Sequence, residues 1–156
     1  MTEQAEPATE TEMVAQLEEI EVDAPRVGII MGSKSDMDVM DGAASVLRDA
    51  DVHHEVRVIS AHREPALVAE YCQNARMRGL RVIIAGAGLS AALPGVAAAH
   101  SDLPVIGVPL SSRLSALGGL DAILSVLQMP PGVPVAGVGL DNAKNAGHLA
   151  LRILRS

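Results

Sequence analysis

Short apolar runs alternate with longer, helix-like stretches from residue 26 to the end of this chain. An alternation of strands with helices is typical of a parallel β-sheet whose strands are joined by helical crossovers. The pattern predicts five strands, at residues 27–31, 55–59, 81–85, 104–109 and 133–138. It also predicts five helices, at residues 36–50, 65–78, 91–100, 114–127 and 142–154. We therefore expect an α/β fold.

The predicted strands VGII, VIIAG and VIGVPL are apolar at consecutive positions. Because the side chains of a strand point alternately to opposite faces, such runs indicate a sheet covered by helices on both faces. We predict a doubly wound, flavodoxin-like parallel sheet of five strands in the order 2-1-3-4-5, within a three-layer α/β/α sandwich. Ligands of such sheets bind at the carboxyl ends of the strands, near the point where the winding reverses.

The first 25 residues differ from the rest of the chain in charge. They contain no Lys or Arg and eight of the nineteen acidic residues: Glu3, Glu6, Glu10, Glu12, Glu18, Glu19, Glu21 and Asp23. The other eleven acidic residues are balanced by all twelve Lys and Arg residues, so the acidity behind the chain's net charge of −7 lies in the leader, and the rest is nearly neutral. We expect residues 1–25 to form an acidic, disordered extension and residues 26–156 to form a single catalytic domain.

Composition also argues against several classes of protein. No apolar run reaches the roughly 18 residues that span a membrane, and no basic stripe favours nucleic acid. Cys72 is the only cysteine, and the spacing of the histidines outside the loops does not suggest a metal site. We expect a cytoplasmic protein without a metal, a membrane anchor or a nucleic-acid partner.

The segment MGSKSD, residues 31–36, follows the first predicted strand and precedes a helix. Ser33 and Ser35 offer hydroxyl groups, and the free backbone N–H groups of a helix start attract anions, so the segment suits a phosphate. Asp36 has two interpretations. It is either the N-cap or a first-turn acid of the helix, or it accepts hydrogen bonds from ribose hydroxyls.

The segment SAHREP, residues 60–65, follows the second predicted strand. His62 is able to donate and accept a proton near neutral pH, although histidines at loop ends are often structural. Arg63 beside it suits a bidentate contact with phosphate, which favours a functional loop. A catalytic triad of Ser60, His62 and Asp36 is not favoured, because the G-x-S-x-G turn is absent.

The third loop, AGAGLSAALPG, spans residues 85–95 and has very little side-chain bulk. Its backbone is able to approach a flat ring and contact the ring's edge with N–H and C=O groups. The alternative is a tight strand-to-helix turn in which the glycines serve packing alone.

Taken together, these loops resemble those of the PurE family, the N5-carboxyaminoimidazole ribonucleotide mutases of purine biosynthesis. The matching motifs are MGSKSD, SAHR, AGAG with LPG, GVPL, LQMPPGVPV and NAKNAGHLALRIL, which span residues 27–154. The resemblance implies a homo-octameric isomerase of the flavodoxin-like fold. It acts on a small ribonucleotide, without a cofactor, and moves a carboxylate from the exocyclic nitrogen to ring carbon 4.

The same resemblance assigns roles to residues of the three loops. His62 is expected to transfer the proton, Ser33, Ser35 and Arg63 to bind the phosphate, and Asp36 to bind the ribose. Further substrate contacts are expected from Ser60, Ala85, Gly86, Gly88 and Leu93.

Two positions bear on the exact reaction. Family mutases commonly have His where this chain has Ala92, and the change removes a donor near the migrating carboxylate. A second branch of the family, which carboxylates aminoimidazole ribonucleotide directly with carbon dioxide, tends to have Lys at the position of Arg63. Arg63 therefore favours the mutase, with the carboxylase as the alternative. A non-catalytic flavin or nucleotide module is disfavoured because Tyr71 is the only aromatic residue.

Two further segments give expectations about surfaces. The last predicted helix has Ala143, Ala146, Leu149, Ala150 and Ile153 at helical spacing, and we expect this apolar face to be covered by neighbouring subunits. Residues 111–121 either close over the site or form an ordinary loop.

Overall fold

The computed structural model describes residues 9, 11, 14 and 24–156, so the predicted extension, residues 1–25, lies almost wholly outside the described residues. Five parallel strands form one sheet: β1 (Val27–Met31), β2 (His54–Val58), β3 (Val82–Gly88), β4 (Val105–Leu110) and β5 (Ala136–Gly137). Their order is β2-β1-β3-β4-β5, as predicted. The helices are α2 (Met37–Asp49), α3 (Pro65–Gln73), α4 (Leu93–Ala99), α5 (Leu120–Leu127) and α6 (Ala143–Arg155).

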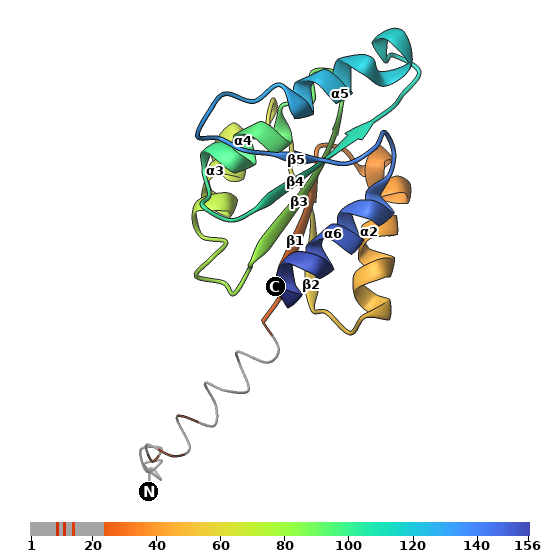
Figure 1. Ribbon diagram of the computed structural model, residues 1–156. Helices are drawn as coiled ribbons and strands as arrows, with labels where there is room; N and C mark the ends of the chain where they lie inside the picture. The colour runs from red at the N-terminus through yellow and green to blue at the C-terminus, as the bar shows by residue number, and fades with distance from the viewer. Residues whose placement is uncertain (1–8, 10, 12–13, 15–23) are drawn as a thin grey trace, which may run out of the picture.

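The helices cover both faces of the sheet, giving the three-layer sandwich of a flavodoxin-like fold (Figure 1). One apolar core lies between the sheet and α2 with α6, and the other lies between the sheet and α3, α4 and α5. Strand β1 contributes Val27, Ile29 and Met31 to the first core and Ile30 to the second. This alternation explains why its sequence is apolar at consecutive positions.

The edge strands are less buried than the central ones. Strand β2 is half-exposed, and β5 is only two residues long, shorter than the predicted 133–138. Residues 130, 131 and 134 are prolines. Proline has no N–H to donate to a ladder, so regular pairing with β4 begins only at Ala136.

Two predicted helices begin or end elsewhere than expected. Helix α5 starts at Leu120 rather than near residue 114, because Leu117, Gly118 and Gly119 adopt positive φ angles of 49°, 68° and 107°. Helix α3 ends at Gln73 rather than Arg78, and the following turns end at Gly79, with φ of 97°. Left-handed residues interrupt the repeating hydrogen bonds of a right-handed helix.

The prediction that neighbouring subunits cover the apolar face of the last helix is wrong for its alanines. Ala143, Ala146 and Ala150 of α6 are buried within the subunit, in the core shared with α2. A Cβ atom on Gly147 would lie 2.9 Å from Val46 Cβ, so the two helices already approach as closely as a glycine allows. Small residues on both helices permit this packing, which the sequence pattern of α6 alone does not reveal.

Candidate active site

The carboxyl ends of the strands form one edge of the molecule, where the three predicted loops meet. Met31 at the end of β1 pairs with Val58 of β2 and with Gly86 of β3. The β1 and β2 loops contact each other, since a Cβ on Gly32 would lie 4.0 Å from Ser60 Cα. The strand order reverses its direction between β1 and β3, and doubly wound sheets bind ligands at the carboxyl ends of the strands beside such a reversal.

The β1 loop is organised by its two serines. Ser33 caps a 3-10 turn, Lys34–Asp36, and its Oγ accepts the N–H of Ser35 at 3.3 Å. The hydroxyl groups of Ser33 and Ser35 are 2.9 Å apart. Helix α2 follows directly and is thirteen residues long. Two adjacent hydroxyls at the start of such a helix suit an anion such as phosphate.

Asp36 precedes α2, but its side chain makes no capping hydrogen bond to the helix. Asp36 thus occupies the N-cap position that the structural interpretation predicts, but its carboxylate is not used to cap the helix. Burial raises the pKa of the Asp36 carboxyl, while a hydrogen bond from the backbone of Ser33 partly opposes the shift. The carboxylate is half-buried and is available to accept hydrogen bonds from a ligand.

In the β2 loop, Ser60 holds the turn that presents His62 and Arg63. The Ser60 Oγ accepts the N–H of Arg63 at 3.3 Å, and the Ser60 carbonyl accepts the N–H of Glu64 at 2.8 Å. Ser60 itself is buried, whereas His62 and Arg63 are exposed. Within residues 24–156, no side-chain hydrogen bond or ion pair engages the imidazole or the guanidinium. Both groups are therefore free to contact a ligand.

The β3 loop divides into a buried part and an exposed part. Ala85 and Leu93 lie in the second core, and Gly86 is covered by the Met40 side chain, whose Sδ would be 2.3 Å from an added Cβ. The chain reaches the open edge at Gly88 and continues into Leu89, which has a φ of 56°. Among the predicted contacts in this segment, Gly88 is therefore the most accessible, while the side chains of Ala85 and Leu93 serve the core.

Ala92, the residue at which this chain departs from the histidine common in family mutases, is half-buried and immediately precedes α4. Its side chain offers no donor. Ser90 is the nearest hydroxyl along the loop and is exposed.

Asp141, which no sequence motif singled out, lies at the same edge. It follows β5, and its carboxylate accepts hydrogen bonds from the backbone and the hydroxyl of Ser111, the first residue after β4. Lys34 and Arg113 are two further exposed cations in the loops at this edge.

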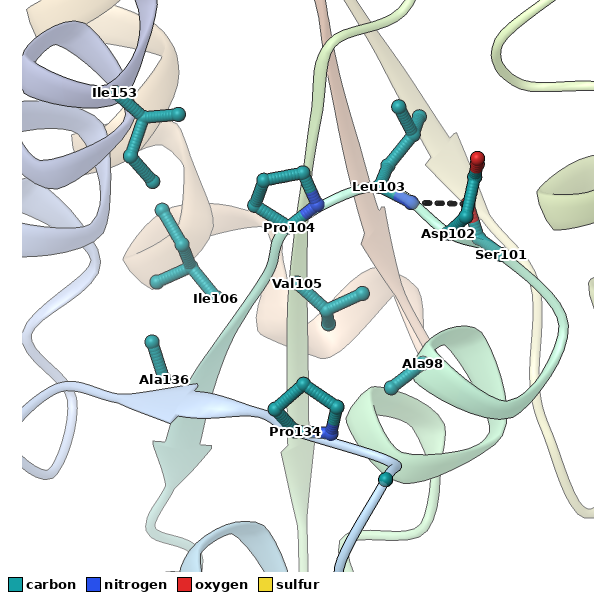
Figure 2. Close-up of a pocket in the computed structure, with 11 residues that line it drawn as sticks. Ala98, Ser101, Asp102, Leu103, Pro104, Val105, Ile106, Pro134, Ala136 and Ile153 are labelled. Carbon is teal, nitrogen blue, oxygen red and sulfur yellow. Dashed lines mark hydrogen bonds between the residues drawn. The ribbon is translucent and has the colours of Figure 1, made fainter. Parts of the chain in front are cut away.

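A separate apolar depression of about 470 Å³ lies at the opposite edge, at the amino ends of β4 and β5 (Figure 2). Val105, Ile106, Pro134 and Ile153 contribute to its wall. Its polar residues are engaged with the protein, because Asp102 pairs with Arg76 and the Ser101 Oγ accepts the N–H of Leu103. It offers no acid, base or nucleophile suited to the expected reaction.

The order of the strands defines a doubly wound α/β protein, and the loops at the carboxyl ends of its strands carry hydroxyl and cationic groups suited to an anion. The family model described as AIR carboxylase matches residues 26–156, and the chain belongs to this family. It is 59% identical over 135 residues to the N5-carboxyaminoimidazole ribonucleotide mutase of Pyrococcus abyssi, covering 86% of this chain and 76% of the relative. The mutase of Aquifex aeolicus is 56% identical over 130 residues, covering 83% and 77% of the two chains.

A solved structure is also similar. The PurE protein of Treponema denticola superposes with a TM-score of 0.73 at 34% sequence identity. The match covers 84% of this chain and 80% of that one.

Proposed function

We propose that this chain is an N5-carboxyaminoimidazole ribonucleotide mutase, an isomerase that yields 4-carboxy-5-aminoimidazole ribonucleotide. The similarity to mutases such as that of Pyrococcus abyssi is the observation that supports it most strongly. The exposed His62 imidazole and Arg63 guanidinium lie on the β2 loop, next to the β1 loop that carries the two serine hydroxyls, and these groups suit the chemistry that this reaction requires.

In the proposed reaction, the carboxylate leaves the exocyclic nitrogen as carbon dioxide, and ring carbon 4 then attacks the trapped gas. His62 gives a proton to the departing nitrogen and later removes the proton from the tetrahedral ring carbon, so no net proton is consumed. Confinement keeps the effective concentration of carbon dioxide high between the two steps.

Binding is assigned to the loops around this imidazole. Ser33, Ser35 and Arg63 hold the phosphate, and Asp36 holds the ribose hydroxyls. The β3 loop, from Ala85 to Leu93, frames the imidazole ring and the carboxylate through its backbone, with Gly88 nearest to the open edge. Ser60 contributes by fixing the turn that presents His62.

We also propose that the chain forms a homo-octamer and acts in the cytoplasm on this small molecule, without nucleic acid. A largely uncharged surface supports self-association. The sequence from Leu114 to Leu140 contains one charged residue, Asp121. Five leucines of this stretch are exposed, three of them on α5, and together we call them the leucine stripe: Leu114, Leu117, Leu120, Leu124 and Leu127. A monomer would leave this stripe in water.

The test supplies purified protein with each of two substrates separately. Rapid conversion of N5-carboxyaminoimidazole ribonucleotide without added bicarbonate is expected of the mutase. If the protein instead converts aminoimidazole ribonucleotide, at a rate that rises with carbon dioxide, it is a carboxylase. This is the alternative suggested by Ala92 and by the family's description as AIR carboxylase.

His62→Asn tests the proton carrier in the same assay. We expect kcat to fall by about 10²–10⁴, the usual contribution of a general acid–base residue. The melting temperature should stay unchanged, because the side chain is exposed. His148→Asn is the matched control, since His148 is also exposed but lies on α6. Equal rates in the His62 variant and in the unmodified protein would exclude the proposed role.

A further inference from the structure

Asp141 connects two segments at the carboxyl-end edge of the sheet. Ser111 donates its backbone N–H to Asp141 Oδ1 at 2.8 Å and its hydroxyl to Oδ2. One carboxylate therefore accepts two hydrogen bonds from a single residue, and hydrogen bonds to an ionised acceptor are stronger than neutral ones.

The backbone of Asp141 is itself held against β4. Its N–H donates to the carbonyl of Pro109 at 2.9 Å, and its φ of 55° lies in the left-handed region. Aspartate tolerates this region better than most residues, yet glycine would adopt it with less strain. This conformation places the side chain of Asp141 beside the first residue beyond the strand.

The peptide group between Leu110 and Ser111 carries the effect to the β3 loop. Gly88 pairs with Leu110, and a Cβ on Gly88 would lie 3.0 Å from the Leu110 carbonyl oxygen. Because a peptide group is planar, fixing the N–H of Ser111 also fixes the direction of that carbonyl. The carbonyl borders Gly88, after which the chain enters the left-handed Leu89 and the exposed part of the β3 loop.

We propose that Asp141 is a positioning residue of the active site. Through Ser111 it holds the 110–111 peptide against Gly88. It thereby positions the β3 loop and the start of the connection between β4 and α5, residues 111–119, for binding the heterocycle. The inference rests on the proposed function, in which the β3 loop frames the imidazole ring.

Asp141→Gly removes both hydrogen bonds while keeping a residue suited to positive φ. We expect its KM for N5-carboxyaminoimidazole ribonucleotide to rise about 10-fold, with a much smaller change in kcat, because the lost interactions serve binding of both substrate and transition state. Asp51→Gly is the matched control. Asp51 also has a positive φ, of 53°, but it lies between α2 and β2 at the opposite edge.

Asp141→Asn should restore a KM close to that of the unmodified protein. Its amide oxygen can accept the N–H of Ser111, while its NH₂ group donates to the Ser111 hydroxyl. Rescue by this variant would separate the hydrogen-bond geometry from a general requirement for negative charge.

Hydrogen–deuterium exchange read by mass spectrometry provides a measurement that is independent of turnover. Peptides covering residues 86–92 and 108–116 should exchange faster in Asp141→Gly and at the unmodified rate in Asp51→Gly. An unchanged KM in Asp141→Gly, an equal rise in the control, or unchanged exchange over residues 86–92 would each overturn the inference. If the unmodified protein does not convert the compound, the proposed function fails, and the exchange measurement alone decides whether Asp141 positions the loop.

Discussion

At the scale of single residues, Asp36 combines a cost in stability with its proposed role in binding. Burial favours the neutral form of its carboxyl, so the folded chain holds this proton more tightly than the unfolded chain does. Stability from this group is therefore fully present below the ordinary pKa of 3.8 and is lost as pH rises through the raised pKa of the folded state. At neutral pH the ionised, half-buried side chain destabilises the fold.

Asp36→Asn should accordingly raise the melting temperature at pH 7. The gain should be no more than about 4 °C, the shift that about 1 kcal/mol produces in a domain of this size. It should shrink as the pH approaches 3.8, and calorimetry of the ligand-free protein across this range measures it. Substrate affinity should fall in the same variant, because the amide no longer offers two acceptor oxygens to the ribose.

Asp102→Asn is a control for which the change in melting temperature should have the opposite sign. The hydrogen bond and ion pair with Arg76 lower the pKa of Asp102, so its replacement should reduce stability slightly at pH 7. A lower melting temperature for Asp36→Asn as well would refute the argument from burial.

At the scale of elements, the sequence predicts the bounds of a helix or strand best where its hydrophobic pattern matches its burial in the fold. Strand β1 begins and ends as predicted because its residues are apolar and central in the sheet. The start of α5 was predicted too early, since Leu117 has no local signal for a left-handed conformation. The partner of the alanine face of α6 was also missed, because contact between α2 and α6 joins segments about 100 residues apart in the sequence. Local periodicity does not encode such a contact.

At the contact between α2 and α6, we expect alanine to destabilise the fold at one glycine and to stabilise it at another. Gly147→Ala places a Cβ 2.9 Å from Val46 Cβ and 3.0 Å from the carbonyl oxygen of Ala43, which cannot move freely. We expect a loss of about 1–3 kcal/mol in the free energy of unfolding, measured by urea denaturation.

Gly42→Ala, on α2 of the same interface, is the matched control. Its Cβ would lie 3.1 Å from Lys144 Cγ, part of a flexible side chain that can give way. Alanine should then stabilise the helix by up to about 1 kcal/mol, its advantage in intrinsic helix propensity. Stabilisation by both substitutions would show that helix propensity, and not close packing, governs this interface.

At the scale of the whole molecule, the candidate site depends on the pairing of the strands, which brings separate loops together. The sequence supplied the three loops, and the parallel register brings the ends of β1, β2 and β3 to one edge. Asp141 illustrates what the sequence could not supply, because its neighbour Ser111 is 30 residues away and belongs to another strand end. The depression of about 470 Å³ at the opposite edge shows in turn that a sizeable hollow of a single subunit need not coincide with the chemistry (Figure 2).

The stripe of exposed leucines makes the proposed assembly testable. Leu124 is 48% exposed, and Leu114 and Leu117 are 77% and 85% exposed, so charged replacements here should leave the core intact. We expect light scattering to give the unmodified chain the mass of an octamer, and Leu124→Lys to give smaller species with an unchanged circular dichroism spectrum. The physical reason is that a Lys ammonium is costly to bury in an apolar interface.

Met77→Lys separates this effect from a general effect of added charge. Met77 is 82% exposed and lies between α3 and β3, outside the leucine stripe. Its replacement should leave the mass unchanged. A monomeric mass for the unmodified chain would contradict the octamer, whereas equal masses for both variants and the unmodified chain would place the interface elsewhere. Leu114 and Leu117 belong to the connection that leaves β4 at the carboxyl-end edge of the sheet, where the candidate site lies. Leu124→Lys should therefore also be measured in the mutase assay, where a loss of turnover parallel to dissociation would link assembly to activity.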